Sequence, residues 1–211
     1  MAQKMMQKLP EGVKEGKEKI SVTEELTTEH GMLDRVMLAM DHTLKKAGSS
    51  TKADLSAINK GCSLIRMVVD DHHSKFEEDS IYPKFENTEM SGFVSTLRTQ
   101  HSEGRKMIDR MMDMSKSGSI RESSDLDTLR SMFRDYHDMM MAHAAWEQTI
   151  LFPALEGKLS SDELKKLKER QEEHEEKLLG KDATEKSYNM LAEIESSAGI
   201  SGLSDFTRRA K

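Results

Sequence analysis

Residues 143–153 read HAAWEQTILFP and carry a histidine and a glutamate four positions apart. Side chains at i and i+4 lie on one face of an α-helix, so His143 and Glu147 would lie one above the other. Followed at steps of three and four, this face is otherwise apolar: Leu129, Phe133, Tyr136, Met140, His143, Glu147, Ile150 and Ala154. A carboxylate on such a face is costly unless a partner compensates its charge, so the stretch predicts a buried polar site.

The same motif occurs earlier in the chain, as HSKFEEDSIYP at residues 73–83. Both copies place a glutamate four residues after the histidine and a proline six residues after the glutamate, so Glu77 corresponds to Glu147. Three further histidines recur at nearly the same spacing, namely His30, His101 and His174. We interpret the pattern as an internal duplication that supplies one metal site from several helices.

The composition favours a helical protein of ordinary domain size. The 211 residues are 33% charged and 5% aromatic, with three prolines and a net charge of −6. This net negative charge does not favour binding to nucleic acid or to an anionic membrane. No apolar run approaches the ~18 residues of a transmembrane helix. The N-terminus lacks the apolar core of a secretory signal, and the single Cys62 cannot form an internal disulfide. We therefore expect a cytoplasmic protein without a nucleic-acid or membrane partner.

The hydrophobic pattern divides the chain into three parts. We expect a polar tail over residues 1–20, a helical domain over 21–180, and a C-terminal helix and tail over 181–211. Helices are predicted over residues 21–47, 52–85, 88–116, 122–156, 161–179 and 184–197. Short turns between the first four predict an all-α, up-down-up-down four-helix bundle with one or two extra C-terminal helices. Counted from the turns, most of the histidines fall at one level inside this bundle.

The inner polar set consists of candidate metal ligands: His30, His73, Glu77, His101, His143 and Glu147, with His174 as a seventh member. Imidazoles suit iron, zinc or copper, and carboxylates can bridge two cations, so the set predicts a dinuclear centre. It is too large for one tetrahedral zinc, and it lacks cysteine ligands. A nitrogen-rich site favours reversible binding of O2 or reaction with NO or peroxide.

In four ordered segments the chain resembles the hemerythrin family, in particular bacterial hemerythrin-like proteins with the HHE cation-binding domain. The segments are LTTEHGML with His30, DHHSKFEEDSIYP with His73 and Glu77, LRTQHSEGR with His101, and HAAWEQTILFP with His143 and Glu147. The resemblance covers roughly residues 20–180. It implies a four-helix bundle that holds two non-haem iron ions, oxo- or hydroxo-bridged, with Glu77 and Glu147 as bridging ligands and the four histidines as terminal ligands.

The chain departs from the oxygen-carrying members of this family in its fifth histidine. Those proteins draw an extra imidazole from within the four helices, whereas the candidate here, His174, lies in QEEHEEKLLG on the fifth predicted helix. The resemblance therefore implies a protein that binds or senses O2, or that defends against oxidative or nitrosative stress by consuming peroxide (H2O2) or NO. The alternatives are an iron sensor or store without turnover, a metal-free helical interaction protein, and a weaker option, a two-zinc or two-manganese hydrolase.

Several residues beside the candidate ligands have roles that the pattern leaves open. Met140 and Tyr136 lie one and two turns from His143 on its face, and Gly104 lies one turn from His101, so all three are candidates to line a ligand pocket. His72, beside His73, is interpreted as an outer partner or a surface residue. The remaining polar neighbours are expected to be solvated, and the alternative for Glu78 and Asp79 is contact with a ligand imidazole: His42, Glu78, Asp79 and His137.

Overall fold

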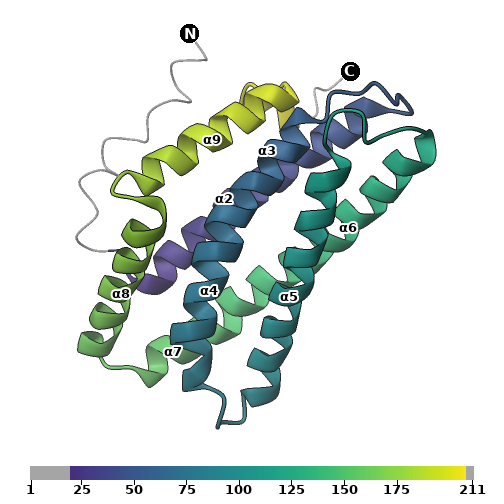
Figure 1. Cartoon of the computed structure of the whole chain (residues 1–211). Helices are drawn as coiled ribbons and strands as arrows, with labels where there is room; N and C mark the ends of the chain where they lie inside the picture. The colour runs from purple at the N-terminus through teal and green to yellow at the C-terminus, as the bar shows by residue number, and fades with distance from the viewer. Residues whose placement is uncertain (1–19, 208–211) are drawn as a thin grey trace.

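Four long helical rods form the bundle, and each runs antiparallel to the rod before it in the chain. Two shorter helices lie along one side of them (Figure 1). This is a computed structural model, and it describes residues 20–207, so the predicted tail over residues 1–20 lies almost wholly outside the described part. The first rod is α2, Val22–Ala47, and the third is α5, Ser91–Met114. Within the described residues there are no strands, and the predicted all-α bundle is confirmed.

The second and fourth rods change their helical winding along their length. The second rod runs through α3 (Ser56–Ile65), η3 (Arg66–His73), α4 (Ser74–Phe76), η4 (Glu77–Ile81) and η5 (Tyr82–Lys84). The fourth runs through α6 (Ser123–Trp146), η6 (Glu147–Leu151) and α7 (Phe152–Lys158). After it come the side helices α8 (Ser161–Leu179) and α9 (Ala183–Ala198), and a short 3-10 turn, η7 (Leu203–Phe206). The α9 helix packs against α2 and α3.

The local sequence explains where the first and fifth helices begin. Ser21 caps α2: its hydroxyl accepts from the Glu24 N–H at 3.2 Å, and its own N–H donates to the Glu24 carboxylate at 2.7 Å. Ser160 and Glu163 form the same reciprocal cap at the start of α8. Both helices therefore begin where the sequence predicts, whereas the second rod begins at Ser56 rather than at residue 52.

Each copy of the repeated motif carries a π-helical segment that begins at its glutamate. The N–H of Tyr82 donates to the carbonyl of Glu77, and that of Phe152 to the carbonyl of Glu147, in each case five residues back. The residue that follows is a proline, which has no N–H to close an α-helical turn, so the proline supplies a local cause for the wider winding. Segments of this kind are frequent at functional sites.

The π-helical segment corrects one part of the predicted core face. Beyond Glu147 the prediction continues through Ile150 and Ala154, but Ile150 is 40% exposed, and Leu151 and Leu155 are fully buried in its place. A π-helical turn contains one extra residue, so the residues after it are rotated about the helix axis. A constant α-helical period therefore predicts the wrong residues on the buried face.

The apolar core is divided into two clusters with a polar layer between them. In α2, Leu26 belongs to one cluster and Leu33 to the other, and His30 lies between them. The second rod repeats this order, with Val69 and Phe76 on either side of His73. The bundle thus sets its candidate ligands at one level, with apolar side chains above and below.

One buried carboxylate, Asp70, lies outside this polar layer. Burial, opposed by the charges of Arg105 and Arg66, raises the pKa of Asp70 from 3.8 to about 7. Between these two pH values the folded protein keeps a proton on Asp70 that the unfolded chain has lost. The contribution of Asp70 to stability should therefore fall as the pH rises from 4 to 7 and stay level above that. We expect Asp70→Asn to remove this fall and to stabilise the protein by roughly 2–4 kcal/mol above pH 7.

Urea unfolding of the apoprotein at several pH values measures this effect. Asp71→Asn is the matched control, because Asp71 is the exposed neighbour of Asp70. An Asp70→Asn variant whose advantage does not grow between pH 4 and pH 7 would contradict the prediction.

Candidate metal centre

Six side chains from the four rods meet in the polar layer as two groups that share Glu147. One group contains His30, His73 and Glu147, and the other contains Glu77, His101, His143 and Glu147. Within each group one ligand atom per residue lies within 4.8 Å of the others. The structure therefore brings together six of the seven candidate ligands from the sequence.

The spacings between ligand atoms, within each group and between His73 of one group and Glu77 of the other, resemble those around a cation. The Nε2 atoms of His30 and His143 lie 3.3 and 3.1 Å from Glu147 Oε2. Those of His73 and His101 lie 3.4 and 3.5 Å from Glu77 Oε2, and the two Nε2 atoms of His101 and His143 are 3.0 Å apart. Two ligand atoms about 2.1 Å from one ion and at right angles to each other are about 3 Å apart.

Several of these buried atoms lack the hydrogen bonds that burial normally demands. The Nε2 atoms of His30 and His73, Oε1 of Glu77 and Oε2 of Glu147 have no hydrogen-bond partner, although each residue is at most 3% exposed. Uncompensated buried polar atoms are rare because each one costs free energy. The chemistry and orientation of these orphaned atoms fit one or two cations.

The two carboxylates repel each other in this apolar setting. Burial and the charge of Glu147 raise the pKa of Glu77 well above its ordinary value. Burial also opposes ionisation of Glu147, but His143 and His30 outweigh it and hold the pKa of Glu147 well below its ordinary value. A positive charge between the two groups would relieve this repulsion.

Each of the four histidines is held on its other nitrogen, Nδ1, by a side chain from the neighbouring rod. The Nδ1 atom of His73 lies 2.6 Å from Glu29, that of His101 3.0 Å from Glu78, that of His143 3.0 Å from Gln100, and that of His30 3.0 Å from the Gln148 amide. Such outer partners fix the ring orientation and leave Nε2 free for a metal. The holding contacts run from rod to rod and close into a ring around the bundle.

The outer partners repeat with the motif, and the sequence analysis missed three of them. Glu29 and Gln100 each precede a candidate ligand histidine, and Glu78 and Gln148 each follow a candidate bridging glutamate. The matching positions in the two copies were the signal that could have revealed them. The sequence predicts Glu78 to be solvated or to contact a ligand imidazole, and the structure shows the contact, with His101. It accepts from His101 and from Arg105, and Arg105 lies 2.7 Å away.

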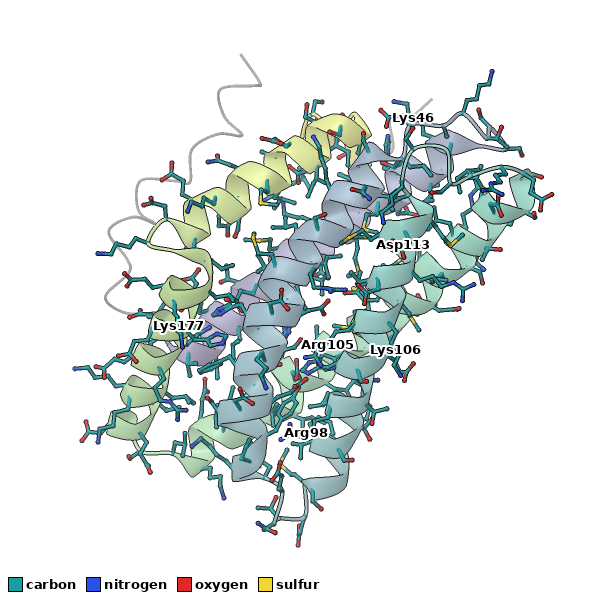
Figure 2. The ribbon with its side chains drawn as sticks, viewed as in Figure 1. Lys46, Arg98, Arg105, Lys106, Asp113 and Lys177 are labelled. Atoms are coloured by element: carbon teal, nitrogen blue, oxygen red, sulfur yellow. The ribbon has the colours of Figure 1, made fainter. Side chains whose placement is uncertain are left out.

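The two copies differ at the aromatic residue before the proline. Phe152 stacks on His30, with ring centroids 5.9 Å apart, and Tyr82 stacks on His101 at 5.6 Å. The Tyr82 hydroxyl, which has no counterpart on Phe152, donates to Glu147 Oε1 at 2.7 Å and lies 3.3 Å from Glu77 Oε2. The Arg98 guanidinium covers the Tyr82 ring at 5.4 Å, and Figure 2 shows Arg98 and Arg105 between α5 and the second rod.

Removing the Tyr82 hydroxyl should weaken metal binding without unfolding the chain. We expect Tyr82→Phe to lower metal affinity about 10- to 100-fold, because the hydroxyl orients the carboxylate shared by both groups. A competition titration against a chelator measures the change. Tyr136→Phe is the matched control, because the Tyr136 hydroxyl is buried but has no hydrogen-bond partner. Equal affinities for the two variants would contradict the prediction.

His174 is the one candidate ligand that the structure does not bring to the two groups. Its Nδ1 atom lies 2.9 Å from Nδ1 of His72, and the two rings are stacked with centroids 5.2 Å apart. His72 is 1% exposed, and its Nε2 atom lies 3.3 Å from Glu29. His72 is therefore an outer residue next to the centre, one of the two positions that the sequence allowed.

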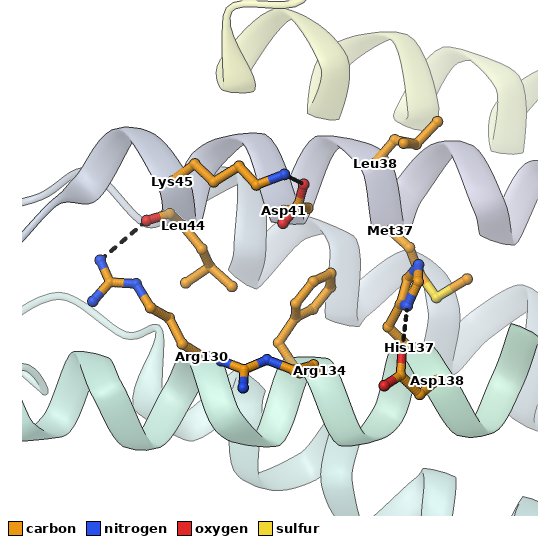
Figure 3. Close-up of a pocket in the computed structure, with 10 residues that line it drawn as sticks. Met37, Leu38, Asp41, Leu44, Lys45, Arg130, Arg134, His137 and Asp138 are labelled. Atoms are coloured by element: carbon orange, nitrogen blue, oxygen red, sulfur yellow. Dashed lines mark hydrogen bonds and ion pairs between the residues drawn. The ribbon is translucent and has the colours of Figure 1, made fainter. Parts of the chain in front are cut away.

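The three predicted pocket residues lie together beside the centre. A Cβ atom placed on Gly104 would meet the Tyr136 ring at 3.5 Å and Met140 Sδ at 3.8 Å. These are ordinary van der Waals distances, so Gly104 packs against the buried Tyr136 and Met140 side chains at the contact between α5 and α6, and a Cβ atom would also fit there. A different hollow, of about 470 Å³, lies between α2 and α6, where Arg130 and Phe133 line it (Figure 3), and it contains none of the six grouped residues.

The fold and the site define a helical-bundle protein with a buried cation-binding centre of histidines and carboxylates, and comparison with known proteins agrees. The hemerythrin HHE cation binding domain matches residues 21–125. Uncharacterized proteins of Mycobacterium tuberculosis (Rv1995) and Mycobacterium bovis (Mb2018) are each 30% identical over 199 residues, which cover 94% of this chain and 78% of theirs. The chain belongs to the hemerythrin HHE cation-binding domain family. No solved structure matches it significantly.

The second copy of the motif lies beyond the matched residues. His143 and Glu147 nevertheless join His30, His73, Glu77 and His101 in the same two groups. Within residues 20–207 no helix is both long enough and apolar enough to cross a membrane.

Proposed function

We propose that this protein holds two iron ions, without haem, and that it binds or reacts with O2, NO or peroxide. The observation that carries the proposal is the pair of buried donor groups joined by Glu147, with two imidazoles in each group. Imidazole and carboxylate donors together suit iron, and carboxylates can bridge two cations. Two imidazoles in each group and the shared Glu147 carboxylate would leave coordination positions open at each iron, and this supports reaction with a small molecule.

The chain's own residues would orient the donors and keep water out. The outer ring of Glu29, Glu78, Gln100 and Gln148 holds each imidazole with Nε2 inward. The Tyr82 hydroxyl donates to Glu147, and the apolar clusters above and below shield the polar layer. When bound, a pair of irons supplies electrons to a small oxidant. Access for such a molecule is favoured beside Gly104, Tyr136 and Met140, where methionine side chains adapt their shape.

Anaerobic loading followed by turnover measurements tests this proposal. Apoprotein supplied with Fe²⁺ should retain two iron ions per chain after gel filtration, and aeration should give the near-ultraviolet absorption of a bridged ferric pair. The loaded protein should then bind O2 or NO, or remove peroxide faster than the same amount of free iron does. One iron ion or none per chain would refute the dinuclear centre. Two irons without binding or turnover would replace the proposal with an iron sensor or store.

A further inference from the structure

A second polar region lies outside the two donor groups, in a hollow where the side helices cover the bundle. Its volume is about 560 Å³, and it is lined by residues of α2, η3, α8 and α9. Five glutamates line this hollow: Glu25, Glu29, Glu172, Glu175 and Glu176. Among the residues that the structure describes, Lys181 is the one lysine or arginine of its lining.

Ion pairs offset only part of this negative charge. Lys168 pairs with Glu25 and lies 3.4 Å from Glu172, and Lys181 lies 3.8 Å from Glu176. Within residues 20–207, five carboxylates therefore share two lysines, and Glu29 is paired with imidazoles rather than with a lysine. A hollow lined by one sign of charge concentrates ions of the opposite sign, so this one attracts cations.

The inner wall of the hollow includes one metal-binding imidazole, that of His72, and a second imidazole, that of His174, lies against it. His72 is 1% exposed and lines the hollow, and its Nε2 atom has no hydrogen-bond partner. Its Nδ1 atom faces Nδ1 of His174, on a different helix, at 2.9 Å. This spacing matches the 3.0 Å between the Nε2 atoms of His101 and His143 in the centre.

A single carboxylate connects this region to the metal centre. One oxygen of Glu29 lies 3.3 Å from Nε2 of His72, and the other lies 2.6 Å from Nδ1 of His73. The other ring nitrogen of His73, Nε2, points into the centre, 3.4 Å from Glu77. The acidic hollow, the histidine pair and the centre thus form one continuous line of donor atoms.

We propose that the hollow is a loading site, where a divalent cation binds weakly to His72 and His174 before it passes to the buried centre. The glutamates attract the cation, the two imidazoles replace part of its water shell, and water completes the coordination. The inference rests on the proposed function, because a loading site needs a centre to supply. It also assigns a role to His174, which lies outside the two donor groups.

The rate of iron uptake tests this assignment. Fe²⁺ is added anaerobically to apoprotein, samples are quenched with a chelator at set times, and the retained iron is measured. We expect His174→Gln and Glu172→Gln to load about tenfold more slowly than wild type, in the range that charged clefts contribute to association rates, and to reach the same final iron content. His137→Gln is the matched control: His137 is 40% exposed, lies 3.1 Å from Asp138, and should load at the wild-type rate. Wild-type loading rates in both test variants would overturn the inference.

A second measurement separates this inference from the proposed function. In Glu147→Gln, where the centre is disabled, added Mn²⁺ should still broaden the imidazole NMR signals of His72 and His174, and His174→Gln in the same background should abolish the broadening at His72. If wild type retains no iron, the proposed function fails and the Mn²⁺ result alone decides on the loading site. The absence of broadening in Glu147→Gln overturns the loading site even when wild type retains two irons.

Discussion

Glu147→Gln should leave the protein with almost no bound metal after loading and gel filtration. Glu147 is the one residue that belongs to both donor groups, and it is fully buried. The amide keeps the shape of the side chain but removes the negative charge that faces His30 and His143. The loss of affinity should therefore exceed the about 10- to 100-fold cost of losing an outer partner. Elemental analysis of the metal per chain measures it.

The control for this substitution is Glu89→Gln, which makes the same chemical change at an exposed residue. It should retain as much metal as wild type. Circular dichroism and thermal unfolding establish that Glu147→Gln is folded, as expected for a change that removes a buried charge. If Glu147→Gln kept the wild-type metal content, the shared carboxylate would not be a ligand.

Removing the metal with a chelator should lower the melting temperature by at least about 10 °C. A ligand at a thousand times its dissociation constant stabilises the folded state by about 4 kcal/mol, and 1 kcal/mol corresponds to about 2–4 °C in a chain of 150–250 residues. The layer left behind holds two buried carboxylates that repel each other and four imidazoles, and several of their atoms lack partners. Differential scanning calorimetry with and without chelator measures the shift.

Glu147→Gln again serves as the comparison, because its melting temperature should hardly respond to the chelator. Addition of Fe²⁺ to the chelated wild type should restore the higher value. An unchanged melting temperature for wild type on chelation would instead favour a metal-free helical interaction protein.

Most of the fold could be predicted because each rod carries one regular apolar face. In α5 the predicted face and the buried residues agree at all six positions: Val94, Leu97, His101, Gly104, Ile108 and Met111. The prediction failed where the winding changes. A pattern of apolar residues at i+3 and i+4 does not indicate that Leu151 is buried in place of Ile150. The extra residue in the turn appears only where the backbone hydrogen bonds span five residues instead of four. The proline two positions after Leu151 was the available signal.

The part of the candidate centre that could be predicted is the set of ligands that recur with the repeated motif. Counting from the turns predicts that most of the histidines lie at one level, and the structure brings His30, His73, His101 and His143 together there. The same count also predicts His174 at this level, and here it is wrong: His174 lies against His72. Its position depends on the angle at which α8 returns along the bundle, and sequence spacing does not fix that angle. Glu29 and Tyr82 were missed because charged and aromatic residues beside a motif are usually surface or core residues, and their contacts come from rods distant in sequence.

The candidate ligands are divided between the two halves of the chain. His30, His73 and Glu77 precede the connection at residues 85–90, and His101, His143 and Glu147 follow it. Each donor group takes members from both sides of this connection, so neither helical hairpin contains a whole group. A bound cation would therefore link the two helical hairpins. A chain cut between residues 85 and 90 should reassemble more tightly with metal than without it.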